Sequence, residues 1–160
     1  MTHQAAQVLA RAALRPALTP TKSGLCEGTH IATLAGHLPV EYLSEGDRII
    51  TRNGARTLRR ITPHALGDCP IEVSKGAFGS ARPERDLHLG PEQLVHLKDW
   101  NNGALWGSDL SLVAISRLVD QRRIQWGEHP GHLVSFILAF DEDETIFAEG
   151  MEIPCPAQSD

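Results

Sequence analysis

The 160-residue sequence has little of what marks several common classes of protein. Its three cysteines, at positions 26, 69 and 155, are too few and too scattered for a disulfide framework, so we expect reduced thiols and a cytoplasmic protein. Aromatic residues make up only 5% of the chain, the formal net charge is −5, and no basic stripe is present, so nucleic acid is not an expected partner. No apolar run is long enough to cross a bilayer, so we expect no membrane partner.

What the sequence does contain favours one compact, mostly β domain. Fourteen glycines and ten prolines, spread along the whole chain, predict many turns between short strands. A hydrophobic content of 41% is typical of a folded globular protein rather than of a disordered one. The length and the uniform composition predict a single core.

The first 23 residues differ from the rest of the chain. Residues 2–18 are rich in alanine and leucine, and the spacing of their apolar positions predicts a short amphipathic helix. Pro16 and Pro20 end that pattern, and residues 19–24 have the composition of a linker. We therefore expect an N-terminal helix and linker over residues 1–23.

After this segment, short alternating runs separated by turns predict strands. Asn53-Gly54 is a strong hairpin signal, because both positions tolerate a positive φ. The run 110–118 fits either a strand or one or two helical turns. A last hairpin is expected around the acidic tip 141–144. The expected strands cover residues 31–33, 38–43, 48–51, 55–61, 70–73, 86–89, 94–97, 134–140 and 145–148.

Several phrases, in a fixed order, resemble one family. Residues 28–51 read GTHIATLAGHLPVEYLSEGDRIIT, and KGAFG at 75–79, RDL at 85–87 and IFAEG at 146–150 follow. Together these phrases resemble the bacterial branch of the Hint (Hedgehog/intein) family. The resemblance implies a Hint-type β-fold of short curved strands over residues 24–156, with a tail at 157–160.

The resemblance also implies a chemistry, against which the residues can be compared. Hint domains perform an N-to-S acyl shift, in which a cysteine at the first position attacks the preceding carbonyl. The family's spacing before Gly28-Thr29 places that nucleophile at Gly24, which has no side chain. Cys26 stands two residues later, on the same face if the strand is regular. His30 is the nearby histidine that can serve it.

The family's second element, a threonine or serine followed three residues later by a histidine, falls on residues 90–93. Gly90 has no hydroxyl, and Gln93 can donate a hydrogen bond but cannot shuttle a proton near neutral pH. His96 is the remaining candidate, but regular strand spacing predicts that it faces away from Gln93. Relatives often have histidines where this chain has Ile137 and Asp143.

These departures predict a Hint fold with degenerate machinery that acts as a binding or structural module, with an unidentified protein as a partner. One alternative is an active domain that breaks the Leu25–Cys26 bond, with Cys26, His30, Gln93 and His96 as its catalytic residues. Another is a small metal- or ligand-binding β protein, for which His129 with His132, or His88 with His96, are the available pairs. One loose pair without partnering cysteines does not make a zinc site, so we expect no metal and no cofactor.

Overall fold

The computed structural model describes residues 18–79, 81–98, 110–128 and 133–158. Within these ranges the chain forms short strands, joined by turns and by two 3-10 helices, so the mostly β prediction is confirmed. The bounds of the elements are β1 (Pro20–Thr21), β2 (Leu25–Cys26), β3 (His30–Thr33), β4 (Gly36–Pro39), η2 (Val40–Tyr42), β5 (Arg48–Thr51), β6 (Gly54–Thr57), β7 (Arg60–Leu66), β8 (Ile71–Val73), β9 (Leu87–Leu89), β10 (Leu94–Lys98), β11 (Leu110–Ala114), η4 (Ile115–Leu118), β12 (Ile124–Trp126), β13 (Val134–Ala139), β14 (Glu144–Ala148) and β15 (Met151–Cys155).

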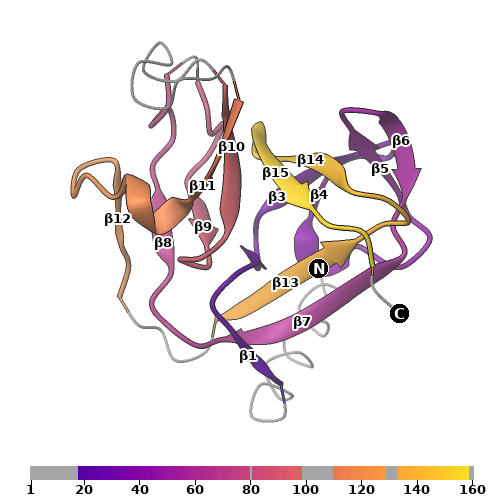
Figure 1. Ribbon diagram of the computed structural model, residues 1–160, viewed down its shortest axis with the longest axis horizontal. Coiled ribbons are helices and arrows are strands. Elements are labelled where there is room, and N and C mark those ends of the chain that lie inside the picture. The colour runs from indigo at the N-terminus through magenta and orange to yellow at the C-terminus, as the bar shows by residue number, and fades with distance from the viewer. Residues whose placement is uncertain (1–17, 80, 99–109, 129–132, 159–160) are drawn as a thin grey trace.

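The described strands form three sheets. The largest has the order β1-β7-β13-β2-β9-β8-β12, the second has the order β15-β14-β3-β5-β6 with β4 added beside β3, and the third is the hairpin β10-β11. In Figure 1 the long strands β7 and β13 lie side by side, with strands β8 to β12 on one side of the molecule and β3 to β6, β14 and β15 on the other. β10 packs against β15, which brings the two sides together.

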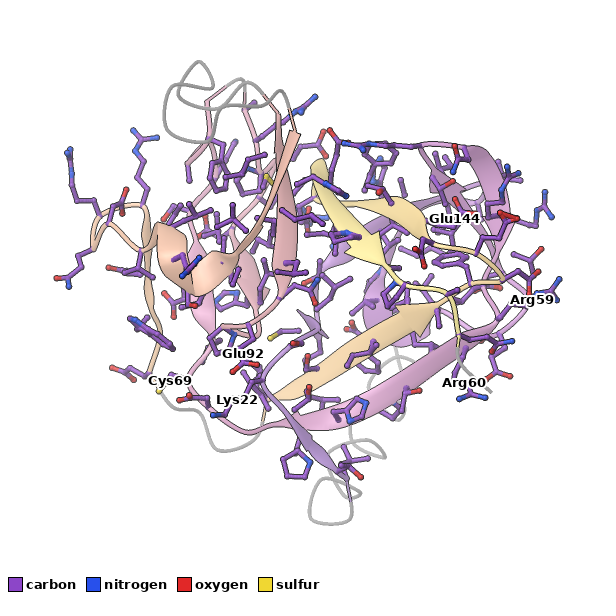
Figure 2. The ribbon with its side chains drawn as sticks, viewed as in Figure 1. Lys22, Arg59, Arg60, Cys69, Glu92 and Glu144 are labelled. Atoms are coloured by element: carbon purple, nitrogen blue, oxygen red, sulfur yellow. The ribbon has the colours of Figure 1, made fainter. Side chains whose placement is uncertain are left out.

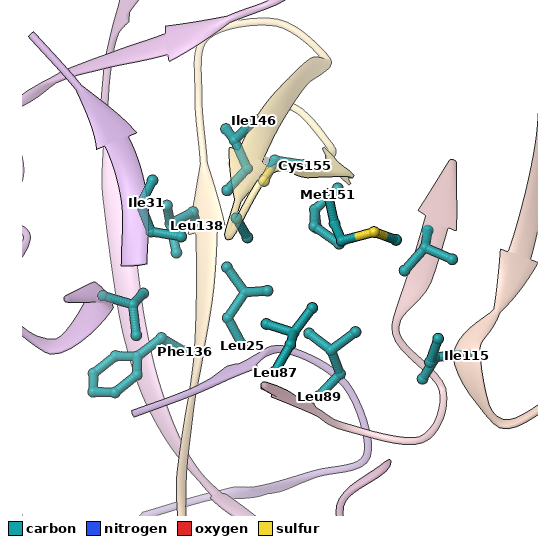
Figure 3. Close-up of a cluster of buried hydrophobic side chains, with 14 of the residues drawn as sticks. Leu25, Ile31, Leu87, Leu89, Ile115, Phe136, Leu138, Ile146, Met151 and Cys155 are labelled. Carbon is teal, nitrogen blue, oxygen red and sulfur yellow. The ribbon is translucent and has the colours of Figure 1, made fainter. Parts of the chain in front are cut away.

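One apolar core holds the sheets together. Figure 3 shows side chains from strands of both large sheets, among them Leu25, Ile31, Phe136 and Ile146, gathered in one cluster. All four are almost completely buried. β2 lies inside this core, between β13 and β9, so the start of the Hint-like region is fixed at the centre of the molecule.

Three expectations about strands need correction. The strand expected over 38–43 ends at Pro39, because Val40–Tyr42 form η2. The expected hairpin 134–148 is wrong, because β13 pairs with β7 and β2 whereas β14 pairs with β15, β3 and β5 in the other large sheet. Both strands are buried along most of their length, so each is covered by a different set of neighbours. The expected strand 55–61 divides into β6 and the start of β7, which belong to different sheets.

The ambiguous run 110–118 is both of the expected structures in turn, a strand (β11) followed by a 3-10 helix (η4). Within the expected linker, Pro20 and Thr21 form β1, which pairs in parallel with the end of β7. The helix expected over 2–18 lies almost wholly outside the described residues. Across the ranges that the structure describes, no helix is long and apolar enough to cross a membrane.

Candidate functional site

The peptide bond between Ser23 and Gly24, at the entrance to β2, is hydrogen-bonded on both sides. The N–H of Gly24 donates to Oε1 of Gln93 at 2.8 Å. The carbonyl oxygen of Ser23 accepts a hydrogen bond from Oγ of Ser135, in β13, at 2.6 Å. Two elements far away in the sequence therefore hold this amide, one at each of its polar atoms.

Position 24 has no room for a side chain in this conformation. Gly24 adopts a φ of +99°, in the region that side chains make unfavourable. A Cβ added there would lie 2.2 Å from Oγ of Ser135 and 2.8 Å from the carbonyl oxygen of Phe136. The Ser135 hydroxyl therefore occupies the space that a nucleophilic side chain at position 24 would need.

The turn before β10 is hydrogen-bonded to the peptide groups on either side of the Ser23–Gly24 amide. Gly90 donates its N–H to the carbonyl oxygen of Gly24 at 3.0 Å, and Glu92 donates its N–H to the carbonyl oxygen of Lys22 at 2.8 Å. Lys22 and Glu92 accordingly lie next to each other in Figure 2. A Cβ at position 90 would lie 2.6 Å from the carbonyl carbon of Ser23, so a threonine does not fit there.

The Gln93 amide is oriented by two contacts. Its Nε2 donates to the carbonyl oxygen of Leu94 at 2.9 Å, which leaves Oε1 facing the N–H of Gly24. Gln93 therefore accepts a hydrogen bond from the Gly24 N–H and has no donor directed at the Gly24 nitrogen. A carboxamide has no titratable proton near neutral pH, so Gln93 cannot protonate a departing amine.

Cys26 is completely buried in β2, opposite Ser135 of β13. Burial, and to a lesser degree the negative charge of Glu27, raises the pKa of its thiol to about 12. A reactive cysteine needs a lowered pKa and access to its target, and this environment provides neither.

His30, the histidine expected to serve Cys26, is engaged elsewhere. Its Nδ1 lies 3.0 Å from the carbonyl oxygen of Gly28 and 3.3 Å from Oε2 of Glu149. Its backbone N–H donates to the same carboxylate oxygen at 2.9 Å. The described contacts therefore tie His30 to the turn after β14 and not to the Cys26 thiol.

Gln93 and His96 line one cavity, with a volume of about 770 Å³. The expectation that they face opposite sides is wrong, because Gln93 belongs to the turn closed by its N–H on the carbonyl of Gly90 and not to β10. His96 does not replace the missing acid, since its Nε2 pairs with Oγ1 of Thr145 at 3.2 Å. Desolvation, followed by the charge of Arg52, lowers the pKa of His96 and keeps the ring neutral.

The metal hypothesis finds no support in the described residues. They contain no group of three histidine, cysteine, aspartate or glutamate residues placed to hold an ion. His88 contacts Glu72 at 3.8 Å and lines a different cavity from His96. His129 and His132 lie outside the described residues.

A sequence model described as the Hint domain matches residues 23–155. The chain belongs to the Hint domain family. The match confirms the resemblance seen in the sequence and covers most of the chain, including the Ser23–Gly24 bond and the turn 90–93.

Solved structures agree on the fold. The solution structure of a bacterial intein-like domain from Clostridium thermocellum has a TM-score of 0.58 at 13% identity, covering 85% of this chain and 99% of that chain. The crystal structure of the gp41-1 intein has a TM-score of 0.52 at 9% identity, covering 82% of this chain and 97% of that chain. The crystal structure of the MchDnaB-1 intein has a TM-score of 0.52 at 13% identity, covering 84% of this chain and 99% of that chain. At such identities the likeness shows the fold alone, and no curated protein matches the chain.

The sequence did not indicate the role of Ser135 in this Hint domain, because a serine in a buried strand gives no signal of its partner. Two buried carboxylates were also missed. Glu149 accepts the N–H of His30 and contacts Arg85 at 3.3 Å, and Glu41 accepts the N–H of Gly28 at 2.7 Å. Both lie within the phrases that resemble the family, and both hold the backbone near β3.

Proposed function

We propose that this Hint domain derives from a self-processing domain, no longer performs the acyl shift, and acts as a binding or structural module. The observation that supports the loss most directly is the environment of Gly24. A glycine with positive φ stands at the nucleophile position, and a buried serine hydroxyl lies where the nucleophile would be.

The first chemical requirement is a thiolate beside the carbonyl carbon that precedes it. Gly24 offers none for the Ser23 carbonyl. Cys26 would have to attack the carbonyl of Leu25, but its thiol stays protonated at neutral pH because burial raises its pKa to about 12.

The second requirement is a proton for the departing nitrogen. The position from which an acid would protonate the Gly24 nitrogen is occupied by Oε1 of Gln93, which is a hydrogen-bond acceptor. An amide whose N–H and carbonyl oxygen are both hydrogen-bonded to uncharged groups is stabilised in its ground state. The Ser135 hydroxyl on the carbonyl oxygen does not compensate, since without an attacking group no oxyanion develops there.

The test is a time course of intact mass on the purified full-length chain, with and without dithiothreitol and with hydroxylamine. We expect the single 17.5 kDa species to persist under all three conditions. Hydroxylamine traps acyl groups on oxygen as well as on sulfur, so it also reports an ester between Ser23 and Ser135. Any fragment ending at residue 23 or 25 contradicts the proposal.

The variant Cys26→Ala distinguishes the alternative of an active domain. If the wild-type chain is cleaved and Cys26→Ala is not, Cys26 is a displaced nucleophile and the domain is an enzyme. We expect both proteins to stay intact, with Cys69→Ala, the partly exposed cysteine, as the matched control.

A further inference from the structure

The cavity beside the Ser23–Gly24 bond remains although the chemistry is absent. Its volume of about 770 Å³ lies within the range of about 300–1,000 Å³ typical of ligand sites. Ser23 and Pro156 both line it, and Ser23 is the first residue of the family match, 23–155, while Pro156 directly follows its last. A polypeptide next to this domain therefore reaches the cavity directly.

The rim of the cavity is apolar and exposed. Leu94 is 42% exposed and Leu112 is 53% exposed, and both line the cavity. Leu112 is the cross-strand partner of His96, so it stands on the same face of the β10-β11 hairpin as that ring. Large apolar side chains that remain exposed next to a cavity are typical of a surface that binds a partner.

Part of the charge in the lining is already neutralised. Glu144 is buried, with its Oε2 3.3 Å from Nε of Arg56, and it accepts a hydrogen bond from Nδ2 of Asn53 at 3.0 Å. The guanidinium of Arg52 pairs with Glu152. Neither group has a net charge to offer to a ligand.

Two other carboxylates in the lining, Glu92 and Asp143, form no ion pair with any described residue. Both are exposed, and Oδ1 of Asp143 only accepts the N–H of Ala157 at 2.8 Å. Lys22 lies near Glu92 but does not line the cavity. The surplus charge of the lining is therefore negative.

His96 adds a buried hydrogen-bonding atom that no described residue pairs with. Its Nδ1 is the buried side-chain atom without a hydrogen-bond partner among the described residues. Buried polar atoms are nearly always paired, so an orphan beside a cavity indicates a ligand or water that completes it.

We propose that the cavity binds an extended segment of a partner polypeptide in which apolar side chains flank a lysine or arginine. The apolar side chains lie against Leu94 and Leu112, and the cation lies between Glu92 and Asp143. This proposal rests on the proposed function, since it names the partner of the module at the same site.

The test uses the full chain labelled with ¹⁵N and the acetylated, amidated peptide Ala-Leu-Lys-Leu-Ala as the probe. We expect titration to shift the signals of residues around the cavity, including the His96 ring nitrogens, and the peptide with glutamate in place of lysine to bind more weakly. n-Butylamine is added separately. If it binds as tightly as the peptide, the site recognises a free amine and the proposal is wrong.

Matched variants assign the contacts. The double variant Glu92→Gln/Asp143→Asn should weaken peptide binding about fivefold, because two exposed charge pairs are lost. The control Glu142→Gln, an exposed carboxylate outside the lining, should bind as the wild type does. Leu112→Ala should weaken binding, whereas Leu34→Ala, at a leucine that is 64% exposed elsewhere, should not. Equal effects of a variant and its control overturn the proposal.

The full-length variant Arg11→Glu/Arg15→Glu tests whether the chain's own first segment occupies the cavity. We expect unchanged peptide affinity, and tighter binding by this variant contradicts a separate partner. The intact mass is measured on the same samples. If the peptide does not bind and the chain stays intact, only this inference is refuted. If the chain is cleaved, only the proposed loss of the acyl shift is refuted.

Discussion

Replacing Gly24 with alanine tests whether the nucleophile position excludes a side chain by steric crowding, in addition to lacking a thiol. The added methyl group would lie 2.2 Å from Oγ of Ser135 and 2.8 Å from the carbonyl oxygen of Phe136. Both contacts are shorter than any relaxed structure tolerates. The chain has to move β2 or β13, or it has to lose stability.

The expected magnitude has two parts. A side chain at a φ of +99° costs about 1 kcal/mol, and forcing a methyl group into a filled site costs about 1–3 kcal/mol. Gly24→Ala should therefore lower the free energy of unfolding by about 2–4 kcal/mol. Gly28→Ala is the matched control, because Gly28 has a φ of +93° but no atom other than those of its chain neighbours lies within 4 Å of the added Cβ. It should lose about 1 kcal/mol.

A double-mutant cycle identifies the cause. Ser135→Ala alone should lose about 1–2 kcal/mol, because it removes the hydrogen bond to the Ser23 carbonyl. In the double variant the closer clash is absent, so the loss should be smaller than the sum of the two single losses by about 1 kcal/mol.

The assay is urea unfolding at constant pH, followed by tryptophan fluorescence and far-UV circular dichroism, with the m-value compared among variants. Additivity of the two single losses, or equal losses for Gly24→Ala and Gly28→Ala, would refute the reasoning. In that case Ser135 does not fill the space of the missing nucleophile.

Further outcomes follow from three buried groups, Cys26, His96 and Glu149. In the native protein we expect Ellman's reagent to modify Cys69 and not Cys26, with all three thiols reacting in denaturant. Since an exposed thiol ionises near its ordinary pKa of 9.0, whereas Cys26 remains protonated up to about 12, the unfolded chain releases this proton first. Stability should therefore fall as pH rises above about 9. A urea midpoint that stays constant above this pH would contradict the prediction. Because the pKa of His96 is lowered in the folded state, the unfolded chain binds that proton first, and stability should fall as pH drops below the ordinary value of 6.5. A titration of the histidine side chains by NMR checks that the pKa of His96 is lowered. Glu149→Gln removes the charge that faces His30 and Arg85, and it should lower the free energy of unfolding by about 1–3 kcal/mol. Glu142→Gln should change it by less than about 0.5 kcal/mol, and equal losses would show that the buried carboxylate has no special role.

Much of the local structure was predictable from local patterns. The expected hairpin between β5 and β6 forms, but Arg52 and Asn53 are its turn residues, and of the pair Asn53-Gly54 only Gly54, the first residue of β6, has a positive φ. The short runs around residues 71–73, 87–89 and 94–97 are strands, as their alternation predicted. The family resemblance also identified Gly24, from the spacing before Gly28-Thr29, and Gln93, from the element at 90–93, as positions to examine, and the structure brings their atoms together.

The pairing of strands was not predictable in the same way. Alternation indicates which side of a strand is buried, but it does not indicate which strand covers it. For this reason β13 and β14, adjacent in the sequence, were expected to pair with each other. The fold places them in separate sheets, where β13 pairs with β7 and β14 pairs with β15.

The sequence alone determined that this chain is a β-rich Hint domain without a nucleophile or an acid at the expected positions, because missing side chains are visible in any conformation. Only the tertiary structure decided what fills those positions. Ser135 reaches the carbonyl of Ser23 across 112 positions of the sequence, and Gln93 shares a cavity with His96 because Gln93 belongs to the turn that precedes β10 and not to the strand. Contacts of this kind depend on how sheets fold over one another, and no local pattern of residues specifies that.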